Sequence, residues 1–129
     1  MYPTDRKYSR EHEWAKVEDD GRVTLGITYY AQDHLGDIVF FELPQVGTAL
    51  SQMQKLGEVE SVKSVSDIFS PVSGEVVEVN QEAMDSPEIV NEDPYEKGWL
   101  VRVSPARPAE MDDLMSASEY ESFLESLEE

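Results

Sequence analysis

The chain has 129 residues, a length that suits one domain and leaves little room for two. Hydrophobic residues make up 40% and charged residues 29%, so the chain can bury a core and extensive disorder is not expected. The 28 acidic and 10 basic residues leave a net charge of −18, which excludes direct nucleic-acid binding and disfavours anionic lipid surfaces. Without cysteine, the chain has no disulfide, no thiolate metal site and no catalytic thiol.

No apolar run approaches the roughly 20 residues that a membrane-spanning helix needs. The longest such run, residues 38–41, is stopped by Glu42 and predicts a buried strand. Residues 1–6 show neither the apolar stretch of a signal peptide nor the character of a transit peptide. We therefore expect a cytoplasmic protein.

The first part of the chain is dominated by short strand patterns separated by turn residues. Asp19-Asp20-Gly21 is a hairpin signal that joins predicted strands over residues 12–17 and 22–27. Further strands are predicted over residues 75–79 and 99–103, the last with Trp99, Val101 and Val103 facing the core. We count six or seven strands in the first 104 residues. Because no pattern is long enough for a crossover helix, they predict an antiparallel, sandwich-like sheet arrangement.

Helical signals occur in the middle of the chain and at its C-terminal end. Thr28 is placed to cap a short helix over residues 29–35, and Gly36 to end it in a left-handed conformation. Pro108 suits a first helical position, and residues 118–121 have the pattern of a capping box. The apolar stripe of this last helix consists of Tyr120, Phe123, Leu124 and Leu127. Eight acidic residues and no basic one follow residue 107; they predict either a solvated helix face or, in addition, a surface that steers basic partners.

The sequence contains no pattern of a catalytic centre. Its seven glycines form no phosphate-binding loop, and no serine lies in a nucleophile context. His12 and His34 are its only histidines, which make a poor set of metal ligands. We expect neither catalysis by the protein's own side chains nor a metal site.

The most informative segment surrounds Lys63. This lysine lies between two short β-prone segments that are flanked by glycines and acidic residues, as expected for a side chain at the tip of a tight hairpin. Among the five lysines, it has the best-defined turn context. An amine at such a tip is accessible to a modifying enzyme. From the spacing alone, a solvated surface lysine without a function remains the alternative.

The motifs around this lysine resemble those of the glycine cleavage system H protein family. Residues 60–64 (ESVKS) and 70–76 (SPVSGEV) are similar to the family's lipoylation hairpin. Further similar motifs follow the family's order, namely EHEW at residues 11–14, GITYYAQDHLGDIV at 26–39, ELP at 42–44, IVNEDPY at 89–95 and GWL at 98–100. The similarity extends over about residues 6 to 127. The chain departs mildly from the family at Val90 and at the bulky pair Phe40-Phe41.

The resemblance implies a mainly β barrel-sandwich hybrid, of the lipoyl/biotinyl-domain type, with a short internal helix and C-terminal helices. The chain would form one domain over residues 1–129, with a core at about 6–104 and a helical extension at about 108–127. The resemblance also implies that Lys63 carries lipoic acid as N6-lipoyllysine. The protein would be a carrier and no enzyme.

The resemblance further implies the partners of this carrier. It would take an aminomethyl group from glycine decarboxylase (P protein) to the aminomethyltransferase (T protein). Electrons would pass to dihydrolipoamide dehydrogenase (L protein), and lipoylating enzymes would load the lysine. We expect a monomer that binds neither nucleic acid nor membrane.

In the family, the loaded arm folds into a surface cleft, where a protonated amine needs carboxylate or hydroxyl partners. The matching candidates are Glu13, Asp67 and His34. Each has an alternative role, since Glu13 could be a plain strand residue, Asp67 could only brace the hairpin and His34 could make a contact at the helix end. Trp14 and Trp99 are expected in the core or in the cleft wall.

Two other functions remain open at the level of sequence. One is an H-like protein that relays lipoyl groups to other complexes, and the other is an unmodified acidic interaction module. A biotin carrier is disfavoured because Lys63 lacks flanking methionines, and a lipoyl domain of the 2-oxoacid dehydrogenases is disfavoured because Val62-Lys63 replaces the usual Asp-Lys dipeptide.

Overall fold

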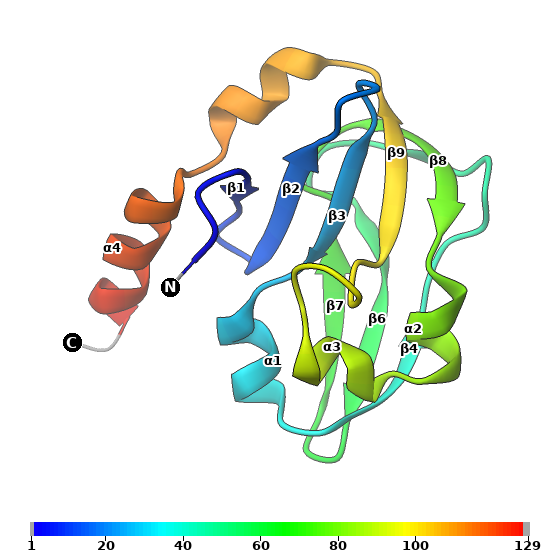
Figure 1. The fold of residues 1–129 in the computed structure, drawn as a ribbon, viewed down its shortest axis with the longest axis vertical. Helices are drawn as coiled ribbons and strands as arrows, with labels where there is room; N and C mark the ends of the chain where they lie inside the picture. The colour runs from blue at the N-terminus through cyan, green and yellow to red at the C-terminus, as the bar shows by residue number, and fades with distance from the viewer. Residues whose placement is uncertain (1, 128–129) are drawn as a thin grey trace.

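The computed structural model describes residues 2–127, which form two antiparallel sheets that face each other. In Figure 1 the smaller sheet lies behind the larger one. The larger sheet has the order β1-β2-β3-β9-β8-β5, and the smaller sheet has the order β4-β6-β7. The strands of the larger sheet are β1 (Lys7–Tyr8), β2 (Glu13–Val17), β3 (Val23–Ile27), β9 (Val101–Pro105), β8 (Gly74–Val79) and β5 (Ala49–Leu50). Those of the smaller sheet are β4 (Ile38–Glu42), β6 (Lys55–Ser61) and β7 (Val65–Phe69).

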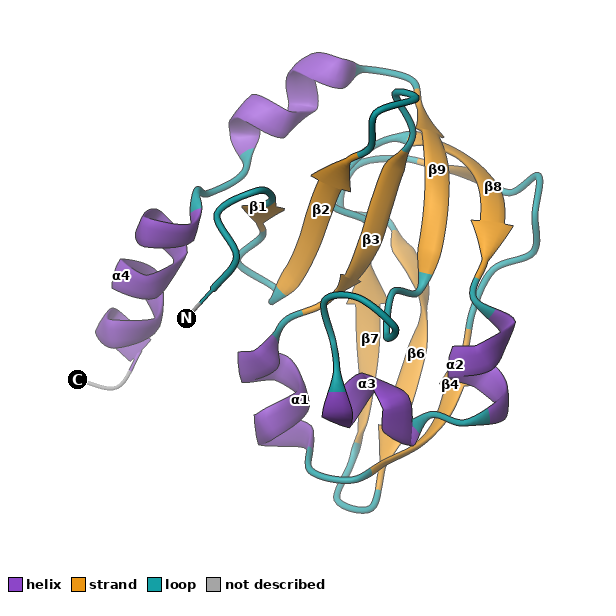
Figure 2. Ribbon diagram, in the orientation of Figure 1, coloured by secondary structure: helices purple, strands orange, loops and turns teal. Residues whose placement is uncertain are grey.

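The helices are short and lie at the ends and flank of this sandwich. They are α1 (Tyr29–Leu35), α2 (Gln81–Asp85), α3 (Glu88–Glu92), the 3₁₀ helix η1 (Pro108–Asp113) and α4 (Ala117–Leu127). Figure 2 shows α1, α2 and α3 together at one end, whereas η1 and α4 run down the side next to β1 and β2. No helix in residues 2–127 is long and apolar enough to cross a membrane.

The main core fills the space between the two sheets. Alternate residues of β3 and β9, such as Leu25 and Val101, meet Phe41, Val59 and Ile68 of the smaller sheet. A second, smaller cluster attaches the C-terminal helix to the rest of the domain. Its members are Tyr8, Trp14, Ala117, Tyr120 and Leu124, and the rings of Tyr8 and Tyr120 stack with their centroids 4.9 Å apart.

The fold confirms the predicted class, a mainly β sandwich-like barrel with a short internal helix and C-terminal helices. All pairings between the strands are antiparallel, and the predicted hairpin joins β2 to β3. The described residues contain nine strands, more than the six or seven predicted. The additional elements include β1 and β5, which have two residues each, too few to show an alternating pattern.

Helix α1 begins and ends where the sequence predicts. The Thr28 side chain accepts a hydrogen bond from the Ala31 N–H, and the backbone of Gly36 has a φ of 79°. Its ψ of −152° differs from the predicted left-handed helical value, and this combination is one that only glycine adopts readily. Helices α2 and α3 were not predicted, because five residues provide little more than one turn of periodicity.

Three details of the predicted elements were wrong. The run over residues 38–41 is not uniformly buried: Ile38 and Phe41 face the core, but Val39 and Phe40 are exposed. The last helix is capped by Ser116 and not at residue 118, since Ser116 and Glu119 each bond the other's backbone N–H. Leu127, expected in the apolar stripe, is exposed.

The two tryptophans occupy different environments. Trp14 is fully buried, and its indole N–H donates to the carbonyl oxygens of Ile27 and Pro94. Trp99 lies before β9 and is only partly buried, with the Arg102 guanidinium 4.0 Å above its ring. The prediction that Trp99 begins the strand was therefore wrong, although its partly buried side chain does pack against the second core cluster.

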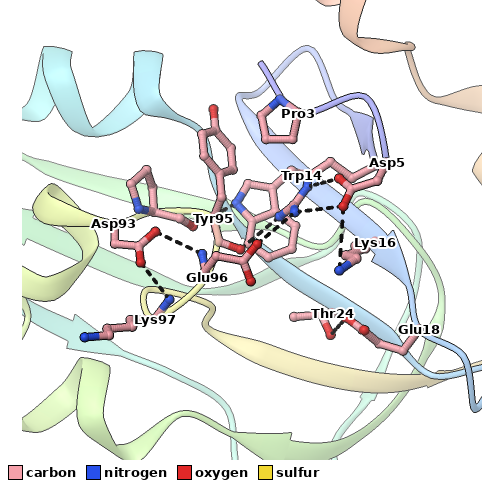
Figure 3. A network of polar contacts seen from close by, with 12 residues as sticks. Pro3, Asp5, Trp14, Lys16, Glu18, Thr24, Asp93, Tyr95, Glu96 and Lys97 are labelled. Carbon is pink, nitrogen blue, oxygen red and sulfur yellow. Dashed lines mark hydrogen bonds and ion pairs between the residues drawn. The ribbon is translucent and has the colours of Figure 1, made fainter. Parts of the chain in front are cut away.

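The N-terminal segment is held against the Trp14 region by a polar network (Figure 3). Arg6 is buried, lies 4.6 Å from the Trp14 ring and donates a hydrogen bond to the Tyr95 carbonyl oxygen. Asp5 accepts a 2.8 Å charge-assisted bond from the same guanidinium. These contacts satisfy a buried charge, which would otherwise be costly.

Candidate functional site

Lys63 lies at the tip of the β6–β7 hairpin, as the sequence predicts. In Figure 1 this loop projects beyond helices α1 and α3 at the lower end of the molecule. The buried Ser61 organises the turn, because its hydroxyl oxygen accepts hydrogen bonds from the N–H groups of Lys63 and Ser64, each at 3.2 Å. The Ser61 N–H also donates to the Ser64 carbonyl oxygen. The backbone of the tip is therefore fixed while the lysine side chain is exposed.

The loop between α1 and β4 supports this tip from one side. The Val62 N–H donates a 3.0 Å hydrogen bond to the Asp37 carbonyl oxygen. A Cβ atom added to Gly36 would lie 3.5 Å from the Cε atom of Lys63, so the lysine stem rests on this glycine. The hairpin tip thus has a partner outside its own sheet.

Asn91 of α3 holds the supporting loop in place. Its amide nitrogen donates to the Gln32 side-chain oxygen and to the Gly36 carbonyl oxygen, and its oxygen accepts from the Ile38 N–H, all at 2.9 Å. These bonds use both N–H donors and one of the two acceptor positions of the amide side chain. Helix α3 is therefore connected to residues 32–38, and these in turn contact the hairpin that presents Lys63.

A cleft of about 370 Å³ opens beside the hairpin. Glu13, His34 and Asp67, the three candidates from the sequence, all line it. So does Ser64, the neighbour of Lys63 in the chain. The structure therefore brings the three candidates to one concave surface that begins next to the lysine. Additional residues at this surface include Glu11, His12, Tyr30 and Ser66.

Glu13 is the buried carboxyl group of the cleft. Its Oε1 accepts a 2.5 Å hydrogen bond from the Ser9 hydroxyl, and its Oε2 accepts a 3.1 Å bond from the Phe69 N–H. Burial, with a smaller contribution from the nearby Glu11, raises the pKa of Glu13 to about 7 against the lowering effect of these two bonds. No lysine or arginine lines the cleft among the described residues. The site therefore favours a positively charged or hydrogen-bond-donating guest.

An aromatic wall forms another side of the cleft. The Tyr30 ring stacks on His34 at 4.0 Å between centroids and packs at a tilt against His12 at 4.5 Å. The Nδ1 atom of His12 lies 2.8 Å from the Tyr120 hydroxyl, which also contacts the Thr28 hydroxyl at 2.8 Å. Burial lowers the pKa of His12, with a smaller contribution from His34. Helix α4 therefore contacts the cleft residue His12 through Tyr120 and holds its ring in place.

His12 and Tyr30 were not recognised as cleft residues from the sequence. Tyr30 and His34 are four residues apart on one helix, so their stacking could have been inferred from the helical period. His12 has a φ of 71°, an unusual value for a residue other than glycine, and no sequence signal indicates it.

His34 and Asp67 also make contacts that agree with their alternative roles, a contact at the helix end for His34 and bracing of the hairpin for Asp67. His34 is exposed, and its Nδ1 lies 3.1 Å from the Tyr30 carbonyl oxygen in the preceding helical turn. Asp67 forms a 3.3 Å ion pair with Lys55, and it pairs across the hairpin with Glu58, which contacts the same lysine. The Asp67 carboxylate thus braces the hairpin in addition to lining the cleft. Neither tryptophan lines the cleft.

The fold and this site define a carrier protein of the lipoyl/biotinyl type. A sandwich of two sheets presents one lysine on a rigid hairpin, and a cleft with a buried carboxyl group adjoins it. A group attached to such a lysine can extend into solvent or lie in the cleft. The described residues contain no group of side chains that could hold a metal ion.

Comparisons with known proteins identify the family. The sequence profile described as "Glycine cleavage H-protein" matches residues 6–127. A glycine cleavage system H protein of Carboxydothermus hydrogenoformans is 56% identical over 126 residues, which cover 97% of this chain and 95% of that one. One from Oceanobacillus iheyensis is 53% identical over 123 residues, covering 95% and 97%. A crystal structure of a glycine cleavage system H protein from Mycobacterium marinum is similar with a TM-score of 0.86 at 45% identity, covering 93% of this chain and 96% of that one.

The chain therefore belongs to the glycine cleavage H-protein family. The family function is that of a lipoyl carrier in glycine cleavage. Members of the family bear lipoate covalently on a lysine and are carrier components of the system, not enzymes in themselves.

Proposed function

We propose that Lys63 is the lysine that carries lipoate, as N6-lipoyllysine, and that the cleft beside it receives the loaded arm. One observation carries this proposal: Lys63 is exposed at the tip of a hairpin whose backbone is held by Ser61 and by the Asp37 carbonyl oxygen. An amide can form on this amine without rearrangement of the fold. The rigid tip then fixes the point from which the arm swings, which is the protein's main contribution to a carrier reaction.

The proposed partners are glycine decarboxylase (P protein), the aminomethyltransferase (T protein), dihydrolipoamide dehydrogenase (L protein) and the lipoylating enzymes. The lipoyl group supplies the disulfide that accepts the aminomethyl group, and the protein carries that group from the P protein to the T protein. Support comes from the family membership and from the net charge of −18, which favours partners with basic surfaces. We propose a monomer that acts as one domain, with a core at about residues 6–104 and a helical extension at about 108–127. The cytoplasm is the proposed location, and the kinship with bacterial relatives supports it.

In the cleft, the proposed role of Glu13 is to hold the protonated amine of the aminomethyl group. The carboxyl group is buried, reaches the cleft and has only neutral partners, Ser9 and the Phe69 N–H. A cation that arrives there gives the carboxylate a charged partner and lowers its pKa. His34 and Asp67 would line the path of the arm at the mouth of the cleft.

The test combines mass measurement with one substitution. After incubation with a lipoate ligase, the intact mass should show one lipoyl group, and peptide mapping should place it on Lys63. Lys63→Arg should abolish modification and glycine cleavage while the far-UV circular dichroism stays unchanged. Lys97→Arg, at another exposed lysine in a turn, is the matched control and should behave like the parent. Retained glycine cleavage in Lys63→Arg would refute the assignment.

A further inference from the structure

A β-bulge in strand β4 exposes two large apolar side chains near the hairpin tip. Ile38 pairs with Ser61 and Phe40 pairs with Glu60, so Val39 has no partner on β6. The extra residue changes the alternation of the strand, and both Val39 and Phe40 face solvent at 49% and 51% exposure. Bulges commonly re-aim side chains for a function, and exposed apolar groups that cluster mark interaction sites.

Two more apolar side chains of the hairpin complete this exposed cluster. Val62 and Val65, on either side of the tip, are 67% and 59% exposed. Val65 pairs with Glu60, which pairs with Phe40, so Phe40 and Val65 share one row on the outer face of the sheet. We call Val39, Phe40, Val62 and Val65 the apolar collar of Lys63. Four of the nine large apolar side chains that are exposed in residues 2–127 belong to it.

Acidic groups surround the collar on the same face. Glu60 lies between Phe40 and Val65 in their row. The next row on this face consists of Glu42, Glu58 and Asp67. Lys55 forms ion pairs with Glu58 and Asp67. A complementary partner therefore has an apolar contact surface with a rim of lysine or arginine side chains.

The length of the lysine side chain indicates which partner must cover this surface. The Lys63 amine extends only about 6 Å from its Cα atom, whereas the lipoylated arm reaches on the order of 10 to 15 Å from the backbone. An enzyme that reacts at the far end of the arm can stay clear of the hairpin tip. An enzyme that acts on the amine itself must bring its active-site walls against the neighbours of Lys63.

We propose that the apolar collar is the docking surface for the enzyme that attaches lipoate to Lys63. In that reaction the neutral amine attacks the acyl carbon of an activated lipoyl donor, either an acyl adenylate or an acyl thioester. The C–N amide bond forms, the adenylate or thiolate leaves with the electron pair, and the amine loses a proton. This inference rests on the proposed function of Lys63, and the collar supplies affinity for the unmodified protein.

The test measures lipoylation of the apo protein by a lipoate ligase with lipoate and ATP at subsaturating carrier concentrations. Phe40→Ser should lower kcat/KM about ten-fold, equivalent to about 1.4 kcal/mol, mainly through KM. Val65→Thr keeps the branched shape, guards against a folding defect and should lower kcat/KM in the same direction. Val46→Ser is the matched control, because Val46 is 63% exposed and lies outside the collar; it should leave the rate unchanged.

A second measurement separates docking of this enzyme from docking of dihydrolipoamide dehydrogenase. The Phe40→Ser variant is first fully lipoylated by prolonged incubation. Dihydrolipoamide dehydrogenase should then reduce its lipoyl disulfide at the same rate as that of the parent. Equal kcat/KM for lipoylation of Phe40→Ser and the parent would overturn the proposal, and so would an equal loss in both reactions. If the parent itself were not modified on Lys63, the proposed function would fail instead, which the intact mass reveals independently.

Discussion

Glu13→Gln is the substitution that tests the cleft most directly. The amide has nearly the same shape as the carboxyl group, and it can accept from the Phe69 N–H and donate to the Ser9 oxygen. The substitution removes the ability to ionise and reverses the direction of the hydrogen bond with Ser9. Burial raises the pKa of Glu13 from the ordinary 4.5 to about 7. At 1.36 kcal/mol for each pKa unit, ionised Glu13 costs the folded protein about 3 kcal/mol above pH 7.

The sign of the pH dependence follows from the direction of this shift. A raised carboxyl pKa stabilises the fold below pH 4.5, and this contribution is lost as the pH rises through 7. The difference in unfolding free energy between Glu13→Gln and the parent should therefore grow in favour of the variant by about 2 to 3 kcal/mol between pH 5 and pH 8. Other titrating groups, including His12, whose pKa is lowered, are common to both proteins and cancel in this difference.

Urea unfolding at pH 5 and pH 8 measures this effect. Glu11→Gln, an exposed carboxylate at the same cleft, is the control and should show a much smaller pH-dependent difference. In protein loaded with the aminomethyl group, Glu13→Gln should have the opposite effect, since a charge-assisted bond is replaced by a neutral one that is weaker by about 1 kcal/mol. Release of formaldehyde or ammonia without the folate enzyme should become about five-fold faster.

The two results together distinguish the proposed role from a structural one. A variant that is merely damaged would be less stable at both pH values and would also release its cargo faster. Parallel pH profiles for the variant and the parent would refute the burial argument. Identical release rates would remove Glu13 from the site and leave Asp67 as the better candidate.

Four further predictions concern the partners and the frame of the site. Reactions with partner enzymes should slow as salt rises from roughly 20 to 300 mM, because screening weakens attraction to the acidic carrier, and salt-independent rates would contradict this. Asn91→Ala should lower the unfolding free energy by about 2 kcal/mol and speed hydrogen exchange at the hairpin tip, whereas unchanged exchange would argue against the link. Gly26→Ala should cost at least about 2 kcal/mol in urea unfolding, since its Cβ would lie 2.5 Å from the Trp14 ring; a neutral effect would mean that the ring can move. Ser116→Ala should cost about 1 kcal/mol in thermal unfolding while Ser118→Ala costs little, and the reverse order would restore the cap predicted from the sequence.

The candidate site could be predicted where it depends on local chemistry. The hairpin around Lys63 follows from turn residues between two short strand patterns, and the Thr28 cap follows from one side chain and the next turn of backbone. The hydrogen bond between His12 and Tyr120 could not be predicted. It depends on the approach of α4 to the residue just before β2, which brings Tyr120 to a residue 108 positions earlier in the chain.

The exposure of Phe40 illustrates the same limit within a strand. Its apolar run indicates burial, and the period of two would assign one face of β4 to the core. The bulge at Val39 breaks that period, and it exists only in the pairing of β4 with β6. A pairing register is a property of two strands together, so one strand's composition does not reveal it.

The sequence by itself determined the fold class, the hairpin and the lysine at its tip, because period, turn chemistry and ordered motifs act over a few neighbouring residues. Only the tertiary structure decided which groups surround that lysine. Burial of Glu13, next to Ser9 and Phe69, raises the pKa of its carboxyl group. Asp67 lines the cleft and also forms an ion pair with Lys55. Burial, register and electrostatic shifts arise when distant segments exclude water between them, and no local stretch of the chain contains that information.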